Sequence, residues 1–155
     1  MPSRMWIKPV DGGLRSDRAG DGKFGAKRGE RTHLGQDYLA DAGAGVVAPA
    51  DGQYRRKIRV YSATDKFIGM EFEANYGMMY LLYYVDPSIN HLEFVKAGQL
   101  IGLAQDIAGY HGGGMLNHVH FQMWFKPYIM LLKDGTWNQN AVYVNPNMFI
   151  DPEKE

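Results

Sequence analysis

No stretch of eleven or more residues in this 155-residue chain repeats apolar side chains at the 3.6-residue period of a helix. The apolar residues instead form short runs of strand length, separated by turns in which glycine, at 19 residues, is frequent. A chain of this length is long enough for one domain with a core of its own. The pattern therefore predicts an all-β fold of mainly antiparallel strands.

The predicted strands follow the apolar runs, with a hairpin turn at residues 75–77. Their ranges are 46–48, 54–61, 67–74, 79–85, 100–104 and 118–125. A glycine-rich loop over 108–114 precedes the last of them, and a late hairpin is expected to pair 128–132 with 141–144 through a turn at Asp134-Gly135.

The N-terminal part of the chain reads differently from the rest. Residues 1–22 are interpreted as an irregular lead-in, and residues 23–155 as a single domain. Glycines alternate with charged residues over 11–32, which indicates an exposed, irregular segment there.

Charge and composition exclude several classes of function. Lys plus Arg and Asp plus Glu both number 17, so the net charge is zero and no nucleic-acid partner is expected. The charge is unevenly distributed, because residues 1–59 carry a net charge of +5 and residues 60–155 carry −5. Cysteine is absent, which leaves histidine and carboxylates as metal ligands. The longest apolar run, Met78–Val85, has eight residues and is too short to span a membrane.

Two patterns among the five histidines have a geometric meaning. His33 and Asp37 are four residues apart, and Gly35 between them allows the backbone to fold closely so that both side chains converge. His118 and His120 project to one face of a strand. Together, His33, Asp37 and one histidine of the pair form a two-histidine, one-carboxylate set, the ligand count of catalytic zinc. The remaining histidine would stand beside the site and accept a proton from water.

Neither pattern is specific by itself. A histidine and an aspartate four residues apart often form a solvated hydrogen-bonded pair. Histidines on a strand also pair with neighbouring strands without any metal. The spacing alone does not choose between His118 and His120 as the ligand.

Four ordered motifs carry a family resemblance. The stretch 25–38 contains His33-Leu-Gly-Gln-Asp37 and runs into Val47-Ala-Pro-Ala-Asp-Gly52. Lys96-Ala-Gly-Gln-Leu-Ile-Gly102 and Asn117-His-Val-His-Phe-Gln122 follow. This order, over about residues 23–125, resembles the lysostaphin/LytM-type zinc endopeptidases. The resemblance implies the duplicated hybrid motif fold, in which an antiparallel sheet lines a substrate groove.

The same resemblance implies roles for individual residues. It assigns zinc (Zn2+) to His33, Asp37 and His120, and the role of catalytic histidine to His118. The implied activity is hydrolysis of peptide cross-bridges or stems of bacterial peptidoglycan, and hence degradation of the cell wall. Peptidoglycan peptides are therefore the expected partners.

One position departs from the family pattern. Peptidases of this type usually carry a further histidine in a Tyr-x-His-Leu motif, and Val85 falls where that histidine is expected. Such a group helps to stabilise the tetrahedral oxyanion. His111 is a candidate catalytic residue because it lies in the glycine-rich loop before the histidine strand. The candidates to replace the missing histidine are Tyr83, Tyr84, His91 and His111.

The departure at Val85 leaves an alternative function open. The chain would then be a weakly active or inactive zinc-binding module that binds the wall, regulates a partner, or serves as a structural protein of a phage virion or tail. The N-terminus has no hydrophobic stretch of the secretory type, so delivery by a virion, or release at lysis as an endolysin, is expected. Residues 126–155 lie outside the resemblance.

Overall fold

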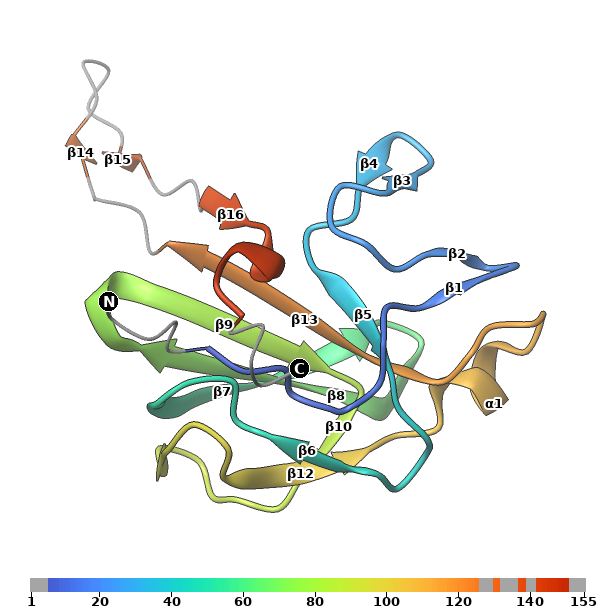
Figure 1. The fold of residues 1–155 in the computed structure, drawn as a ribbon. Helices are drawn as coiled ribbons and strands as arrows, with labels where there is room; N and C mark the ends of the chain where they lie inside the picture. The colour runs from blue at the N-terminus through green and yellow to red at the C-terminus, as the bar shows by residue number, and fades with distance from the viewer. Residues whose placement is uncertain (1–5, 126–129, 132–136, 139–141, 151–155) are drawn as a thin grey trace.

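The computed structural model describes residues 6–125, 130–131, 137–138 and 142–150, and these form mainly antiparallel sheet (Figure 1). The largest sheet of the described residues has seven strands. Six of them follow the order β11-β7-β8-β9-β13-β16, and the seventh, β5, pairs with the first half of β13 on the same side as β16. Its strands are β5 (Gln36–Leu39), β7 (Gly52–Tyr61), β8 (Thr64–Ala74), β9 (Met78–Tyr83), β11 (Phe94–Val95), β13 (His118–Phe125) and β16 (Val142–Val144).

A second, three-stranded antiparallel sheet has the order β10-β12-β6. Small two-stranded pairs, one short helix and two 3-10 turns complete the described elements. The three-stranded sheet consists of β6 (Gly45–Val47), β10 (Val85–Pro87) and β12 (Leu100–Ala104). The remaining elements are β1 (Ser16–Asp17), β2 (Gly20–Asp21), β3 (Lys27–Arg28), β4 (Arg31–Thr32), β14 (Met130–Leu131), β15 (Trp137–Asn138), α1 (Ile107–His111), η1 (Asn75–Gly77) and η2 (Pro146–Met148).

Alternation along β13 separates the core from the histidines. Val119, Phe121 and Met123 are fully buried and belong to the hydrophobic core with Tyr80 and Leu82 of β9. Burial of each such side chain contributes about 1.5–3 kcal/mol relative to exposure. Since side chains alternate between the faces of a strand, the residues at even positions of β13 lie on the opposite face.

The all-β prediction is confirmed, and the strands 100–104 and 118–125 have the predicted bounds. The predicted strand 79–85 is interrupted, because β9 ends at Tyr83 and β10 begins at Val85 in the other sheet. The predicted loop 108–114 begins inside the helical turn α1, where the Asp106 side chain accepts a hydrogen bond from the backbone N–H of Gly109. A single cap can therefore stabilise a turn too short to show helical periodicity.

The pairing predicted for the late hairpin is wrong. Residues 128–129, 132, 134–135 and 141 lie outside the described residues. In the part that the structure covers, β14 pairs with β15, whereas β16 pairs with Met123–Phe125 of β13. The last three residues of β13 extend beyond the end of β5, and β16 satisfies the backbone groups of that edge.

Residues 6–10 pack on the sheet, whereas most of the segment 11–32 is exposed or half-buried, as its composition predicts. Trp6 is 7% exposed and contacts Tyr80 edge-on, with ring centroids 5.4 Å apart. The backbone N–H of Ile7 donates to the carbonyl of Pro49, and Arg15 is only 3% exposed. Residues 6–10 therefore belong to the packed fold, and Arg15 is a buried residue within an otherwise mostly exposed segment. No helix in the described ranges is long and apolar enough to cross a membrane.

Candidate metal centre

The pairing of β13 with β5 brings His120 and Asp37 together. The two strands are antiparallel, and the register places His120 directly opposite Asp37 and His118 opposite Leu39. Residues directly opposite in an antiparallel pair have Cβ atoms about 4.5–5.5 Å apart on the same face. On the other side of β13, His120 is opposite Tyr83 of β9. The sheet itself therefore sets the spacing of the candidate ligands.

His33 reaches the same place because the chain turns tightly at Gly35. A Cβ atom on Gly35 would lie 2.4 Å from the carbonyl oxygen of Phe121 and 2.9 Å from Cε1 of His120. Only glycine permits this approach to β13. The backbone of His33 is anchored in turn by its N–H, which donates to the carbonyl of Ala26 at 2.8 Å. The expected role of Gly35, to let His33 and Asp37 converge, is confirmed.

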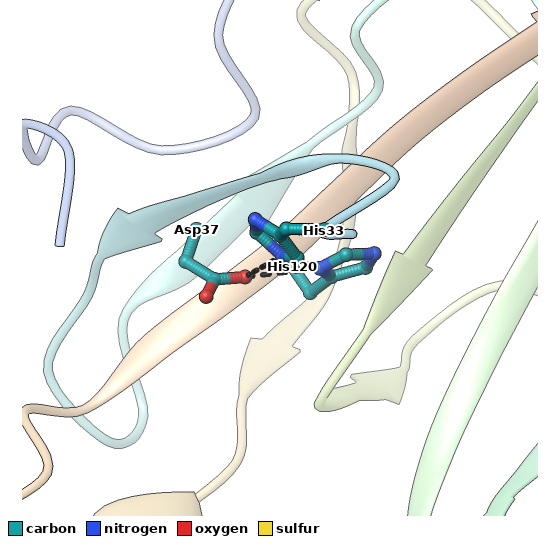
Figure 2. Close-up of side chains that lie close together, drawn as sticks. All are labelled: His33, Asp37 and His120. Atoms are coloured by element: carbon teal, nitrogen blue, oxygen red, sulfur yellow. Dashed lines mark hydrogen bonds and ion pairs between the residues drawn. The ribbon is translucent and has the colours of Figure 1, made fainter. Parts of the chain in front are cut away.

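Three buried ligand atoms converge at this position (Figure 2). His33 Nε2 lies 3.0 Å from His120 Nδ1 and 3.2 Å from Asp37 Oδ1, and His120 Nδ1 lies 2.9 Å from the same oxygen. In a tetrahedral site with ligands about 2.0–2.1 Å from the ion, neighbouring ligand atoms are about 3.3 Å apart. The triangle of nitrogen and oxygen atoms is close to one face of such a tetrahedron.

The outer nitrogens of both imidazoles contact oxygen acceptors. His33 Nδ1 lies 3.0 Å from the carbonyl oxygen of Lys23, and His120 Nε2 lies 2.8 Å from Gln122 Oε1. A neutral imidazole that donates through its outer nitrogen presents a lone pair at its inner one. The lone pairs of the two inner nitrogens and an oxygen of Asp37 then face one another. Because all three are electron-rich, they repel unless a proton or a cation lies between them. The set therefore fits a divalent metal of the zinc type, with its tautomers fixed by outer hydrogen bonds.

The second carboxylate oxygen of Asp37 is bound by Arg15. The guanidinium donates to Asp37 Oδ2 through Nε at 3.2 Å and Nη2 at 3.0 Å. Its Nη1 donates to both oxygens of Asp17, at 2.9 and 3.0 Å. Arg28 adds a more distant charge, 3.6 Å from Asp37 Oδ2. Arg15 thus fixes the carboxylate so that only Oδ1 faces the two histidines.

Asp17 connects this group to His118. Its carboxylate accepts hydrogen bonds from the backbone N–H groups of Ala19 and Leu116, both at 2.8 Å. The carbonyl of Leu116 in turn accepts a hydrogen bond from Nδ1 of His118 at 2.8 Å. A continuous series of contacts therefore runs from Asp37 through Arg15 and Asp17 to His118.

His118 lies beside the three converging atoms without joining them. It is 3% exposed, and its Nε2 lies 3.9 Å from Asp37 Oδ2. Because Nδ1 donates to Leu116, Nε2 carries the lone pair. Burial lowers the pKa of His118, and the negative charge of Asp37 offsets part of that effect. A neutral imidazole with an available nitrogen is the form that a general base requires.

Asp37 is held in its ionised form. Burial alone would raise the pKa of this carboxyl, but when the inner nitrogens of His120 and His33 carry protons instead of facing a cation, their hydrogen bonds hold it well below its usual range. The nearby charge of Arg15 favours the same state. The carboxylate is therefore a permanent anion at the centre of the site.

The structure separates Val85 from the site. Val85 is 0% exposed, belongs to the hydrophobic core and pairs with Ala104 in the three-stranded sheet. The side chain that this segment places against His118 is Tyr84, whose ring meets the imidazole edge-on with centroids 5.3 Å apart. The neighbouring Tyr83 stacks on His120 instead, at 5.2 Å.

The two remaining histidines occupy different places. His111 ends α1, and its Nε2 lies 3.0 Å from the hydroxyl of Tyr61, so it approaches the site through that side chain. His91 contacts the carbonyl of Arg55, near the start of β7, whereas Tyr61 ends that strand. Tyr61 is six positions along the strand from Arg55, which is on the order of 20 Å, so His91 lies outside the site. Sequence reasoning did not identify Arg15 or Asp17, and no local motif signals them.

No protein-family model matches the sequence. The fold is nevertheless similar to that of several solved structures, each 20% identical in sequence to this chain. The catalytic domain of lysostaphin, an antimicrobial peptidase from Staphylococcus simulans, matches over 86% of this chain and 90% of its own length, with a TM-score of 0.57. Helicobacter pylori Csd3 matches over 94% of this chain with a TM-score of 0.63. A zinc-containing peptidase from Vibrio cholerae matches over 91% with a TM-score of 0.55.

These likenesses show that the chain has the lysostaphin/LytM-type β fold expected from its motifs. The chain spans 33% of the length of Csd3 and 39% of the Vibrio cholerae peptidase. The match to the lysostaphin catalytic domain, in contrast, includes most of both chains.

The role of Arg15 in holding Asp37 can be tested by its effect on stability. Arg15→Ala leaves the buried Asp37 carboxylate without its partner, so we expect the metal-free protein to lose about 3–5 kcal/mol of unfolding free energy. The matched control is Arg56→Ala, which removes a surface pair with Glu71 and should cost less than about 1 kcal/mol. Urea unfolding of both variants measures the difference, and equal losses would contradict the assigned role of Arg15.

The Asp17 hydrogen bonds predict a pH dependence. Burial alone would raise the pKa of Asp17, but hydrogen bonds from Leu116, Arg15 and Ala19 hold it below its ordinary value. A carboxyl whose pKa is lowered by folding stabilises the folded state at pH values above its unfolded-state pKa of about 3.9. This contribution is lost as the pH falls below that value and through the lower pKa of the folded state. Asp17→Asn should therefore destabilise the protein at pH 7 more than at pH 3. Urea unfolding at both values provides the measurement, and a pH-independent loss would contradict the prediction.

Proposed function

We propose that this chain is a zinc-dependent endopeptidase that hydrolyses peptide bonds of bacterial peptidoglycan. The observation that carries the proposal is the convergence of His33 Nε2, Asp37 Oδ1 and His120 Nδ1 beside the buried Nε2 of His118. The zinc-containing peptidase and the lysostaphin catalytic domain among the structural neighbours support the same reading. The motif order of the sequence supports peptidoglycan peptides as the substrate class.

The proposed zinc ligands are His33, Asp37 and His120, with a fourth position for water or substrate. A zinc ion there would polarise the scissile carbonyl and make water easier to deprotonate. Arg15 keeps Oδ1 of Asp37 directed at this position. His33 and His120 are each 8% exposed, so the ligand group is nearly but not fully enclosed by the protein.

His118 is the proposed general base. Its Nε2 takes a proton as water oxygen forms a bond to the carbonyl carbon, and the carbonyl π electrons move to oxygen. When the carbon–nitrogen bond breaks, His118 returns that proton to the leaving nitrogen. The electron pair on the carbonyl oxygen re-forms the C=O bond in that step, and the products are a carboxylic acid and an amine, which at neutral pH become a carboxylate and an ammonium group, so that atoms and charge balance. The hydrogen bond from Nδ1 to Leu116 orients the ring throughout.

One observation favours a second candidate function. Tyr84, and not a histidine, lies against His118 in the described part of the chain, which is compatible with a zinc-binding module that binds wall peptides without cleaving them. The roles of endolysin, virion protein or tail protein, and delivery by a phage, stay predictions from the sequence. The experiment below separates cleavage from binding.

The purified chain is expected to bind one zinc ion and to release new amino groups from isolated cell walls. A chelator should abolish the release and added zinc restore it. His118→Ala removes the base and should lower the rate by about 10²–10⁴-fold while zinc content is kept. The matched control His91→Ala removes a histidine outside the site and should leave the rate unchanged. Metal analysis and amine release from walls with several cross-bridge types measure these effects.

The possible outcomes separate the two candidate functions. Zinc binding without amine release from any wall type would overturn the peptidase and support the binding module. Absence of stoichiometric zinc would contradict both. Full activity of His118→Ala would contradict the role assigned to that histidine.

The contact between His120 and Gln122 predicts an effect on zinc affinity. Gln122→Met removes the acceptor of His120 Nε2, and loss of such an outer contact typically lowers metal affinity by about 10–100-fold. Gln53→Met, on β7, provides the control because its amide donates to the carbonyl of Leu92 outside the site. Competition with a chromophoric chelator measures both affinities. Equal affinities would show that Gln122 does not orient His120.

A further inference from the structure

A hydrogen-bonded chain of three side chains leads from His118 to the surface. The Tyr84 ring contacts His118 edge-on at 5.3 Å. The Tyr84 hydroxyl lies 2.9 Å from that of Tyr61, and the Tyr61 hydroxyl lies 3.0 Å from Nε2 of His111. These residues come from three separate parts of the sequence, so the chain of contacts depends on the tertiary fold. The proposed mechanism does not yet use any of them.

The backbone at Tyr84 is held in an unusual conformation. Its φ is 68°, in the left-handed region that bulky residues seldom adopt because it is strained. Both backbone groups are fixed, because the N–H donates to the carbonyl of Ile68 at 2.9 Å and the carbonyl accepts from Gln105 at 2.8 Å. The conformation breaks the alternation of the strand, so that Tyr84 meets His118 while Val85 enters the core.

Glycine would adopt this conformation without strain, but it would supply no side chain to the site. A strained residue that is fixed by its surroundings beside a candidate active site indicates a functional constraint. The group that the strain positions is a phenol, which can donate a hydrogen bond through its hydroxyl. Burial raises the pKa of Tyr84 far above its ordinary value, and the charge of Asp37 adds to this effect. The hydroxyl therefore keeps its proton at neutral pH.

We propose that Tyr84 is a catalytic residue that donates a hydrogen bond to the scissile carbonyl oxygen as this oxygen gains negative charge. The inference rests on the proposed peptidase function. It assigns to Tyr84 the hydrogen bond to the oxyanion for which related peptidases are expected to use a histidine at the position of Val85. No proton is transferred in this step, and the hydrogen bond strengthens as charge develops.

Tyr61 and His111 are positioning residues in this account. If His111 Nε2–H donates to the Tyr61 oxygen, the Tyr61 hydroxyl donates to the Tyr84 oxygen, and the Tyr84 proton is left for the substrate. Successive hydrogen bonds in one direction polarise one another and strengthen the last donor. Stacking of Tyr61 on Tyr84, with centroids 6.2 Å apart, restricts both rings.

The test deletes single hydroxyl groups from the zinc-loaded full chain. Tyr84→Phe is expected to lower kcat by about 10²–10³-fold, the usual effect of removing one oxyanion donor, with KM and zinc content unchanged. Tyr61→Phe should lower kcat by a smaller factor, again without a change in KM. Tyr110→Phe is the matched control, because Tyr110 stacks on Tyr61 at 6.1 Å while its hydroxyl lies outside the chain of hydrogen bonds.

A second measurement does not require turnover. A phosphinic analogue of the cleaved peptide carries a tetrahedral anionic group that resembles the transition state. Tyr84→Phe should weaken its binding by a factor similar to the loss in kcat, whereas Tyr110→Phe should not. Circular dichroism checks that each variant is folded, which is expected because only an oxygen atom is removed.

The outcomes distinguish this inference from the function on which it rests. If the wild-type chain cleaves its substrate and Tyr84→Phe does so with undiminished kcat, the role of Tyr84 is overturned and the peptidase stands. If Tyr84→Phe raises KM or loses zinc with kcat unchanged, the residue serves binding or structure and the inference is also overturned. If the wild-type chain cleaves no wall substrate, both the function and the inference fail.

Discussion

The two oxygens of Asp37 divide the site into an inner and an outer part, and the remaining geometry depends on this division. Oδ1 faces the two imidazoles, while Oδ2 is bound by the buried guanidinium of Arg15. Without Arg15 the carboxylate would be free to rotate and to offer either oxygen. Through Asp17, the same guanidinium is connected to the segment that orients His118. The ligand group and the proposed base are therefore held by one continuous set of contacts.

Much of the inner part could be predicted from the sequence, because strand geometry is local. The two-residue period of β13 places His118 and His120 on one face, whatever else the chain does. Gly35 between His33 and Asp37 indicates a close backbone approach, which the structure shows against β13. Neither β5 nor its register with β13 could be predicted, because only β13 shows a clear strand pattern; that the two segments share one site was implied by the family resemblance alone.

The outer part could not be predicted, because its contacts join segments that have no pattern of their own. Arg15 lies among glycines and charges typical of an exposed loop, and only the fold shows that it is buried against a residue 22 positions away. The segment around Tyr84 could not be predicted for another reason. In a regular strand, side chains alternate between the two faces of the sheet. The left-handed φ of Tyr84 shifts this alternation by one position. The partner of β16 was mispredicted because strands of two or three residues are too short to specify their pairing.

The central claim is that His33, Asp37 and His120 together hold one zinc ion, and X-ray absorption at the zinc edge tests it most directly. The account predicts two imidazole ligands and oxygen ligands, all at about 2.0–2.1 Å, in a four-coordinate site. Replacement of His120 by alanine should reduce the imidazole count by one. A spectrum with fewer than two imidazoles in the wild-type protein, or one that the replacement of His120 leaves unchanged, would contradict the account.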